Sequence, residues 1–237
     1  MADGDERPDP GLGVFDTLLV RGGRAVGLGA HVDRLAHSVR ELYGVPVEAG
    51  ALASRIAAGA VGALGLATAR VRTSYLPTTR GWQVDATRIE EPGLDPWALA
   101  VRRVPGGLGP HKWTDRRLVS DPGEADDVLL LDEHARVLEC GTANVFAVLG
   151  GVVVTPPGDG RILPGTVRQR VLARLRENHR PVEERDIILA ELREATEVFT
   201  TSSIRGVQPV IRCDDVGSWP IGRTTTWLRA SVADADA

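Results

Sequence analysis

The sequence predicts an α+β protein made of two sub-domains. In the first half of the chain, a β-rich run is followed by two helical stretches and then by a series of strands. The second half is a strand series with helices after it. The segment 105–110 (PGGLGP) separates the halves, because its glycines and flanking prolines cannot continue a helix or a central strand. A chain of 237 residues with 43% hydrophobic residues can bury a sizeable core without disulfides or metals.

The N-terminal sub-domain is expected over 11–104, behind a charged, Pro-rich tail at 1–10 that is expected to be disordered. Its first helix has apolar residues at helical spacing and ends before Gly44, and its second helix is rich in alanine. Runs of β-formers between turn residues indicate the strands. The expected elements are a strand at 14–20, helices at 31–43 and 49–64, and strands at 69–76, 83–89 and 97–104.

The larger C-terminal sub-domain is expected over 111–237, after a linker at 105–110. Gly150 and Gly151 between two apolar runs predict a hairpin turn. Amphipathic spacing predicts the long helix in this half. The expected elements are a short helix at 114–119, strands at 127–131, 137–139, 145–149 and 152–155, helices at 165–178 and 187–194, strands at 197–201 and 207–213, and a terminal helix at 222–233.

The composition argues against several classes of function. A formal charge of −4 is unlike that of a nucleic-acid-binding protein, which normally carries a basic patch. The longest apolar runs fall far short of a membrane span, and the acidic start of the chain is unlike a secretory signal. Cys140 and Cys213 have no paired spacing, which indicates a cytoplasmic protein. The five histidines show no metal-site spacing and are expected to be solvated or to cap helices.

One residue type is nearly missing from the chain. Of its 28 basic residues, 27 are arginine and only Lys112 is lysine. A GC-rich genome explains arginine on solvated surfaces, where the two residues are nearly exchangeable. They are not exchangeable where an amine must lose its proton and attack a carbonyl, because arginine stays protonated. Lys112 is therefore a candidate for amine chemistry.

Segments that follow this lysine carry residues suited to a phosphate and an electron-poor ring. Glu139 offers a carboxylate, and the Gly-Thr step at 165–166 opens a predicted helix whose first N–H groups favour an anion. Ser202 and Ser203 offer hydroxyls in a turn after a strand. Each feature also has an ordinary structural explanation as a surface carboxylate, a helix cap or a polar turn. Together, a lysine, a carboxylate and a phosphate cradle are the parts that a pyridoxal phosphate enzyme needs.

The order and spacing of these segments resemble the class IV aminotransferase family, the fold type IV pyridoxal phosphate enzymes, over 13–210. Residues 13–18 (GVFDTL) resemble the opening G-x-F-E-T segment of that family, and 31–35 (HVDRL) resembles its H-x-x-R-L helix. The later segments match in the same order. The resemblance implies two α/β sub-domains with the cofactor in the cleft between them, and a homodimer.

The resemblance also implies a role for each matching residue. Lys112 matches the lysine that forms the Schiff base, and Glu139 matches the carboxylate that pairs with the pyridine nitrogen. The other residues implied to bind the cofactor, mainly its phosphate, are Arg34, Gly165, Thr166, Val167, Ser202 and Ser203.

Within the family, the segments that begin at 111, 139 and 201 look most like 4-amino-4-deoxychorismate lyases. The similarity implies conversion of that substrate to 4-aminobenzoate and pyruvate, a step of folate biosynthesis. An amine substrate with carboxylate groups is therefore expected. The pocket residues expected for it are Thr17, Arg72, Arg116 and Arg205. Two alternatives stay open: an aminotransferase acting on branched-chain or D-amino acids, and a degenerate member that binds a ligand without turnover.

Overall fold

A computed structural model describes residues 7–64, 68–93 and 95–233. These residues form mixed helices and strands around two sheets, which confirms the predicted α+β class. They divide into two compact units. The N-terminal unit holds the described residues of 8–93 and 111–116, and the C-terminal unit holds Arg7 and the described residues of 95–110 and 117–233.

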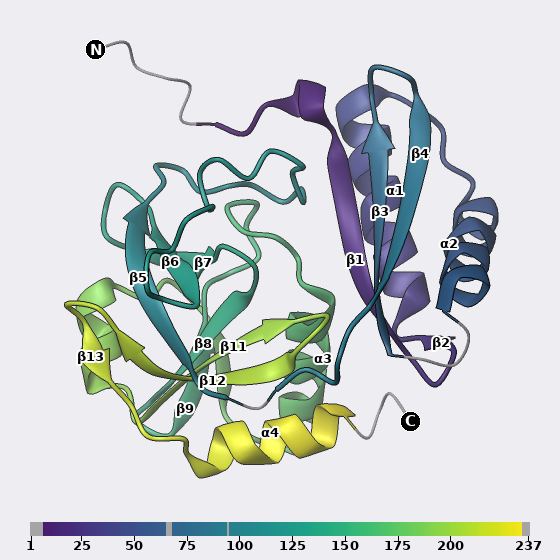
Figure 1. Ribbon diagram of the computed structural model, residues 1–237. Helices are drawn as coiled ribbons and strands as arrows, with labels where there is room; N and C mark the ends of the chain where they lie inside the picture. Colours follow the sequence, from purple (N-terminus) through teal and green to yellow (C-terminus); the bar gives the residue numbers. More distant parts are fainter. Residues whose placement is uncertain (1–6, 65–67, 94, 234–237) are drawn as a thin grey trace. The chain divides into compact units, whose positions relative to one another are not determined.

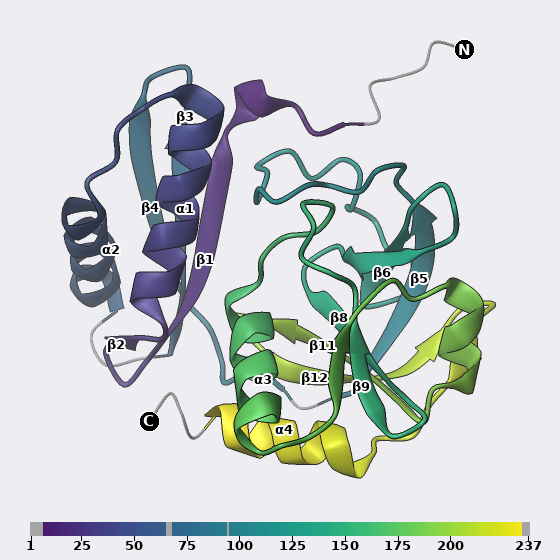
Figure 2. The same cartoon turned by 180° about the vertical axis from the view of Figure 1, so that it is seen from behind.

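The N-terminal unit contains an antiparallel sheet in the order β2–β1–β3–β4. Its strands are β1 (Val14–Arg21), β2 (Arg24–Ala25), β3 (Ala69–Leu76) and β4 (Gly81–Arg88). The helices α1 (Leu28–Tyr43) and α2 (Ala49–Leu64) both lie against one face of this sheet (Figures 1 and 2). Gly44 ends α1 in the left-handed conformation with φ of 62°, as a glycine at that position predicts.

Alternation along β1 gives the sheet two different faces. Val14 and Leu18 pack with Leu35 of α1 in the core beneath the helices. Phe15 and Thr17 alternate with these core residues, so they point to the face away from the helices.

The C-terminal unit is built on a curled sheet of nine strands (Figure 1). The strands are β5 (Trp97–Arg103), β6 (Asp127–Leu131), β7 (Val137–Cys140), β8 (Asn144–Leu149), β9 (Val152–Thr155), β10 (Val182–Glu184), β11 (Glu197–Ser202), β12 (Gly206–Cys213) and β13 (Gly217–Ser218). They are ordered β10–β9–β8–β11–β12–β5–β6–β7, and β13 pairs with β12. The glycine pair between β8 and β9 forms the predicted two-residue hairpin turn.

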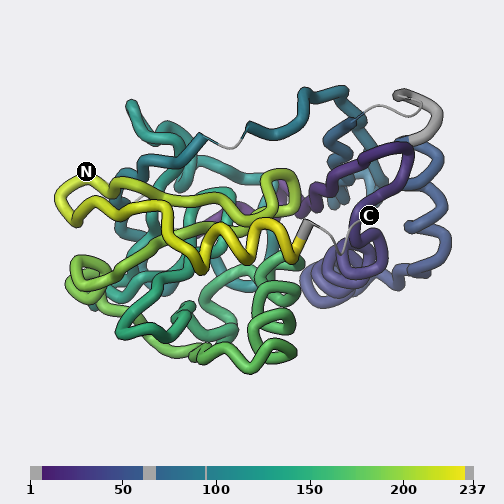
Figure 3. Tube along the Cα trace, turned by 90° about the horizontal axis from the view of Figure 1, so that it is seen from below, coloured from purple at the N-terminus to yellow at the C-terminus, as the bar shows by residue number. Residues whose placement is uncertain are grey.

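Two helices pack on one face of the C-terminal sheet. They are α3 (Thr166–Glu177) and α4 (Arg223–Ala233), which lie beside each other, green and yellow in Figure 3. Val171 of α3 and Leu228 of α4 share a core with Phe146 and Phe199, whose rings stack with centroids 5.0 Å apart. A separate apolar cluster that includes Leu129 fills the other face.

The division into units differs from the expected sub-domains at the middle of the chain. The strand β5 belongs to the C-terminal unit because it pairs with β6 and β12. The segment 105–110 also belongs to that unit, where the N–H of Gly109 donates to the carbonyl oxygen of Arg161. The next six residues, 111–116, belong to the N-terminal unit. Local composition identified the break, whereas hydrogen bonds to distant strands decide which unit each segment joins.

Most predicted helices and strands lie within three residues of their expected bounds, with two exceptions. The helix predicted at 114–119 is wrong, because this stretch forms turns instead. The helix predicted at 187–194 is a 3-10 helix, Leu189–Glu194, and Ile188 before it pairs with Arg136. The strands β2, β10 and β13 were not predicted, because two or three residues carry no periodicity.

The tail expected to be disordered at 1–10 lies only partly within the described residues, since 1–6 lie outside them. At Asp9 and Pro10 the expectation is wrong. The N–H of Asp9 donates to Oδ2 of Asp115 at 2.9 Å, and the hydroxyl of Tyr43 donates to the carbonyl oxygen of Pro10 at 2.8 Å. Pro10 also begins a short 3-10 helix, η1 (Pro10–Leu12).

Candidate active site

The segment that carries the single lysine runs alongside β1 in the N-terminal unit. The N–H of Phe15 donates to the carbonyl oxygen of Lys112 at 2.9 Å, and the N–H of Thr114 donates to the carbonyl oxygen of Gly13 at 3.0 Å. Gly13 has φ of 88°, and a Cβ there would lie 2.1 Å from the carbonyl oxygen of Tyr75. The opening glycine is therefore required by the path of the chain beside the lysine segment.

The side chain before the lysine fixes this segment to α1. His111 is 7% exposed, its Nδ1 lies 3.1 Å from the hydroxyl of Ser38, and its ring meets Trp113 edge to face. Its Nε2 lies 4.0 Å from the carboxylate of Glu41. Burial lowers the pKa of His111 from 6.5, a direction that Glu41 opposes and His37 reinforces.

Two of the expected substrate residues lie together near the lysine. Thr17 of β1 and Arg72 of β3 are cross-strand partners on the face away from the helices. The guanidinium of Arg72 lies 3.7 Å from the centroid of the Phe15 ring, and the amine of Lys112 lies 5.3 Å from the same centroid. This face thus combines an amine, a cation and an aromatic ring. Arg116, the third expected residue of this unit, is partly exposed at the end of the lysine segment.

Arg34 lies on the opposite, helix-covered side of the same sheet. Its Nε and Nη2 each donate to a carboxylate oxygen of Asp16 at 2.8 Å, and its side chain is 8% exposed. Asp16 alternates with Phe15 and Thr17 along β1, so it points toward α1. The sequence resemblance identified Arg34 but not its partner Asp16.

The C-terminal unit contains a buried network around Glu139. Asn144 donates through Nδ2 to Oε2 of Glu139 at 3.2 Å and to the carbonyl oxygen of Leu163 at 2.9 Å. The N–H of Leu163 donates back to both carboxylate oxygens of Glu139, at 3.2 and 3.3 Å. Glu139 is 5% exposed, which excludes the interpretation of a surface carboxylate.

The same asparagine explains the glycine that precedes α3. A Cβ at Gly165 would lie 1.9 Å from Oδ1 of Asn144, so a larger residue would require the Asn144 side chain or the backbone to shift. Gly165 is the extended N-cap of α3, and Thr166 and Val167 are its first two helical residues. The first N–H groups of a helix have no partner within it, so they can serve an anion. Asn144 therefore links the carboxylate network to the candidate phosphate site.

The strand β11 brings the serine turn to the same edge of the unit. Thr201 of β11 pairs in register with Asn144 of β8, and Ser202 is the last residue of that strand. Ser202 and Ser203 are both partly exposed. The hydroxyl of Thr201 is buried and has no hydrogen-bond partner among the described residues. Thr201 is an added candidate that the run of four hydroxyl residues could have signalled.

Arg205, expected to bind substrate, lies in the turn that follows these serines. It is exposed, its N–H donates to the hydroxyl of Ser202 at 3.4 Å, and its guanidinium lies 5.4 Å from the centroid of a Trp97 ring. Arg168, a buried arginine of α3, has a structural role instead. Arg168 donates to the carbonyl oxygen of Pro156 and to Glu184, both at 2.8 Å.

The expectation that the histidines are solvated or capping is wrong for two of the five. His31 and His111 are buried and hydrogen-bonded to side chains of the N-terminal unit.

No group of three metal-ligating side chains occurs within 7–64, 68–93 and 95–233. Among the helices described, none is long and apolar enough to cross a membrane. Burial raises the pKa of both cysteine thiols.

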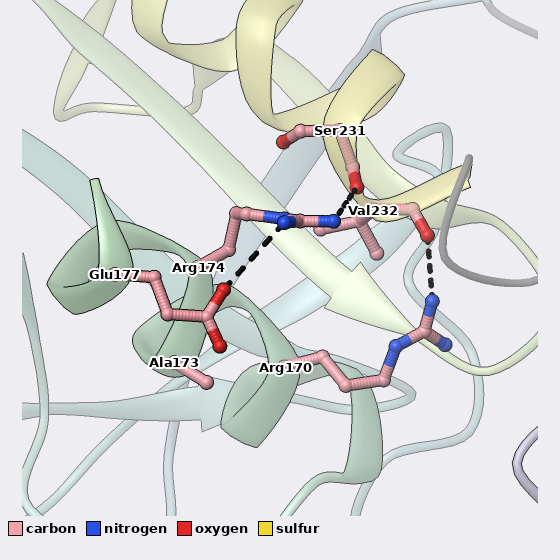
Figure 4. A pocket seen from close by; sticks show the side chains of 6 residues that line it. All are labelled: Arg170, Ala173, Arg174, Glu177, Ser231 and Val232. Carbon is pink, nitrogen blue, oxygen red and sulfur yellow. Dashed lines mark hydrogen bonds and ion pairs between the residues drawn. The ribbon is translucent and has the colours of Figure 1, made fainter.

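A pocket between α3 and α4 is formed by other residues (Figure 4). Arg170 donates to the carbonyl oxygen of Val232 at 2.6 Å, and Arg174 donates to that of Ser231 at 3.1 Å. These arginines neutralise the negative end of the α4 dipole. None of the predicted site residues lines this pocket, whose polar groups serve the packing of the two helices.

Comparison with known proteins shows which family this arrangement is similar to. The family model described as Amino-transferase class IV matches residues 120–213, which include Glu139, Gly165 and the serine turn. The fold IV-transaminase from Curtobacterium pusillum superimposes with a TM-score of 0.79 at 26% identity, over 94% of this chain and 86% of its own. The C-terminal part of the chain is similar to the class IV aminotransferase family. The sequence resemblance to this family and its fold type is confirmed.

The solved structures similar to this chain include both a lyase and an aminotransferase. The 4-amino-4-deoxychorismate lyase from Pseudomonas aeruginosa has a TM-score of 0.76 at 25% identity, over 99% of this chain and 96% of its own. An aminotransferase from Brucella abortus, bound to the cofactor PLP, has a TM-score of 0.82 at 23% identity, over 100% of this chain and 94% of its own.

The curated sequence relatives match over shorter segments. D-alanine aminotransferase from Listeria monocytogenes is 38% identical over 87 residues, which are 37% of this chain and 30% of the relative. Branched-chain-amino-acid aminotransferase-like protein 1 from Arabidopsis thaliana is 33% identical over 115 residues, 48% of this chain and 20% of the relative. The chain thus spans less than a third of the length of these two relatives.

Proposed function

We propose that this chain is a pyridoxal phosphate-dependent lyase that converts 4-amino-4-deoxychorismate to 4-aminobenzoate and pyruvate. The observation that carries the proposal is the position of Lys112, the only lysine, beside the face of β1 and β3 that holds Thr17 and Arg72. An arginine next to a reactive amine suits an amine substrate that carries carboxylate groups. The lyase similarity of the lysine segment and the match to a lyase over 99% of the chain support this choice of reaction.

The residues present suit pyridoxal phosphate. The buried guanidinium of Arg34, the first N–H groups of α3 and the hydroxyls of Ser202 and Ser203 are donors for a phosphate dianion. Glu139, buried and held by the neutral donors Asn144 and Leu163, suits a protonated ring nitrogen. When bound, the cofactor supplies an electron sink that stabilises negative charge at the carbon next to the substrate nitrogen.

The residues of the chain then handle binding and proton movement. Lys112 would hold the cofactor through its amine, and the same amine, when free, would act as general base and acid. It removes the proton from the ring carbon that bears the substrate nitrogen. It returns a proton to the methylene carbon of the enolpyruvyl group while the ring C–O bond breaks, so that pyruvate leaves and the ring becomes aromatic. Thr17, Arg72, Arg116 and Arg205 bind and orient the substrate carboxylates in this proposal.

A class IV aminotransferase is the second candidate function. The observation that favours it is the identity of 33–38% to D-alanine and branched-chain aminotransferase-like relatives. The same lysine would move a proton from the amino acid, and a keto acid would leave. The third alternative is a degenerate protein that binds a ligand without turnover. The retained Lys112 argues against this alternative.

Borohydride reduction of the protein mixed with pyridoxal phosphate tests the cofactor assignment. Because the chain has one lysine, a reduced adduct in a peptide map is expected at Lys112 and at no other side chain. The matched control is Arg24→Lys, which places a second lysine on the exposed β2 strand. An adduct at residue 24 equal to that at Lys112 would show unselective labelling and remove the support.

Turnover assays decide between the reactions. Aminodeoxychorismate should yield 4-aminobenzoate and pyruvate in equal amounts, without a keto acid as co-substrate. Transfer of amino groups between a panel of D- and branched-chain amino acids and keto acids, without 4-aminobenzoate formation, would replace the lyase by the aminotransferase. An adduct at Lys112 with neither reaction would identify a binding protein.

A further inference from the structure

Acidic side chains from three parts of the C-terminal unit converge on Arg161, in the loop 156–165 that joins β9 to α3. Its Nε donates to Oδ2 of Asp159 at 2.8 Å, and its Nη2 donates to Oδ1 of Asp186. Its Nη1 lies 3.6 Å from Oδ2 of Asp132, whose side chain is 1% exposed. One guanidinium therefore pairs with three carboxylates, and one of these is fully buried.

The same carboxylates connect this loop to the hairpin that carries Glu139. Asp132 lies in the turn between β6 and β7, and Arg136, just before β7, donates through Nε to Oδ2 of Asp132. Arg136 also donates through Nη1 to Oδ2 of Asp186 at 3.3 Å. Burial by itself raises the pKa of Asp132, but hydrogen bonds from Arg136 lower it below 3.8, so the carboxylate is ionised at neutral pH. A buried carboxylate in this state needs its cationic partners.

Two positions further along the loop, the backbone contacts the buried carboxylate of Glu139. The N–H of Leu163 donates to both carboxylate oxygens of Glu139, at 3.2 and 3.3 Å. Between Arg161 and Leu163, the side chain of Ile162 is buried in the same apolar cluster as Leu138 of β7. Three consecutive residues thus hold the loop to β7 and its turn, through ion pairs, an apolar side chain and a backbone hydrogen bond.

We propose that Arg161 is a positioning residue that holds the N–H of Leu163 on the carboxylate of Glu139. The inference rests on the proposed function and deepens it, because it names the residue that fixes the proposed partner of the ring nitrogen. Arg161 touches neither cofactor nor substrate in this proposal. Its ion pairs restrict the loop, so the carboxylate of Glu139 keeps one orientation before the ring binds, and a preorganised charge acts without reorganising during the reaction.

Amide hydrogen exchange, followed by NMR on the purified chain with and without pyridoxal phosphate, tests this link. Arg161→Gln removes the charge that holds the loop. It is expected to speed exchange at the Leu163 amide about tenfold or more, as for the loss of a hydrogen bond to a charged group. The amide of Trp219, which donates to the carbonyl oxygen of Ile211, reports the stability of the whole unit. Its exchange should change much less.

Arg136→Gln is the matched control, because it removes a guanidinium from two of the same carboxylates but lies outside the loop. It keeps the contacts of Arg161 with all three, so exchange at Leu163 should stay near that of the wild type. An equal effect of both variants, or equally faster exchange at Leu163 and Trp219, would show general destabilisation and overturn the proposal. Unchanged exchange at Leu163 in Arg161→Gln would overturn it directly.

Asp186→Asn serves as the second variant in case Arg161→Gln does not fold. The side chain of Asp186 is 40% exposed, so its replacement leaves no buried charge unpaired. It weakens the hold on the same guanidinium, and exchange at Leu163 should rise, though less than in Arg161→Gln. Wild-type exchange at Leu163 in this variant would likewise overturn the inference.

Turnover of aminodeoxychorismate gives a second readout. Arg161→Gln should lower kcat about tenfold with little change in KM, as for the loss of one such bond. In the Glu139→Gln background the same change should have no further effect, because both residues act through one carboxylate. Additive losses in the double variant would overturn the inference. The proposed function fails separately, if the wild-type chain binds no pyridoxal phosphate or forms no 4-aminobenzoate, and the exchange results stand in either case.

Discussion

At the scale of single residues, the chemistry proposed for Lys112 is one that no arginine can perform. Its backbone is fixed to β1 and its amine lies 5.3 Å from the Phe15 ring centroid. Lys112→Arg keeps the charge but cannot act as an amine nucleophile or base. We expect turnover to fall about 10²- to 10⁴-fold and the reduced adduct to disappear. The measurement is kcat on aminodeoxychorismate, and turnover near that of the wild type would remove Lys112 from the mechanism.

Glu139, unlike Lys112, is a residue whose charge should matter more than its shape. Glu139→Gln keeps a hydrogen-bonding side chain of the same size beside Asn144 and Leu163, but it loses the negative charge. We expect kcat to fall about 10²- to 10³-fold, as when a preorganised group is removed, while cofactor affinity changes little. Steady-state kinetics with saturating pyridoxal phosphate measure this effect. An unchanged kcat would assign Glu139 a purely structural role.

At the scale of helices and strands, the start of α3 contains a glycine, Gly165, that lies close to the side chain of Asn144. Gly165→Ala would place its Cβ 1.9 Å from Oδ1 of that residue, so the hydrogen-bonded Asn144 side chain or the helix start must shift. We expect a loss of about 1–3 kcal/mol in the free energy of unfolding, as for overpacking, and weaker cofactor binding. Denaturant unfolding and equilibrium dialysis measure the two effects.

A control glycine lies in another helix. A Cβ at Gly29 of α1 would meet nothing within 4 Å, and its φ is not positive. Gly29→Ala should therefore stabilise the chain by about 0.5–1 kcal/mol. If both alanine variants behave alike, the contact with Asn144 is not the cause. The double variant Gly165→Ala/Asn144→Ala should regain part of the lost stability.

The lysine segment and α1 are joined by a titratable contact at His111. Its pKa is lowered by burial, so folding favours the neutral ring. The stability from this contact is complete above pH 6.5 and is lost as the pH falls through the lower pKa of the folded state. We expect the melting temperature to drop less between pH 7 and pH 5 in His111→Gln, which can still bond to Ser38, than in the wild type. His134→Gln, at an exposed histidine, should keep the wild-type dependence.

At the scale of the whole molecule, we expect two copies of the chain to associate. The expectation comes from the resemblance to class IV aminotransferases, which implies a homodimer. Sedimentation equilibrium of the protein with pyridoxal phosphate should give twice the chain mass of 25.3 kDa. A monomer mass at concentrations that support turnover would exclude a role for dimerisation in activity.

The sequence by itself determined much of the fold, because periodicity and turn residues act locally. The strand at 69–76, the helix at 49–64 and the glycine hairpin at 150–151 lie where alternation, helical spacing and glycine conformation require them. The near absence of lysine likewise singled out Lys112 without any coordinates. The helix predicted at 114–119 failed because hydrogen bonds to distant residues overrode its local preference.

Only the tertiary structure decided which residues meet. Asp16 and Arg34 are 18 positions apart, and their pairing depends on how α1 crosses β1. Asn144 reaches Glu139, Leu163 and Gly165 because β7, β8 and the loop before α3 converge. Such contacts follow from burial of polar groups, which must find partners wherever the packed chain provides them. The spacing of residues along the chain does not show which polar groups will be buried together. The candidate site residues could therefore be predicted from the sequence, but their hydrogen-bond partners could not.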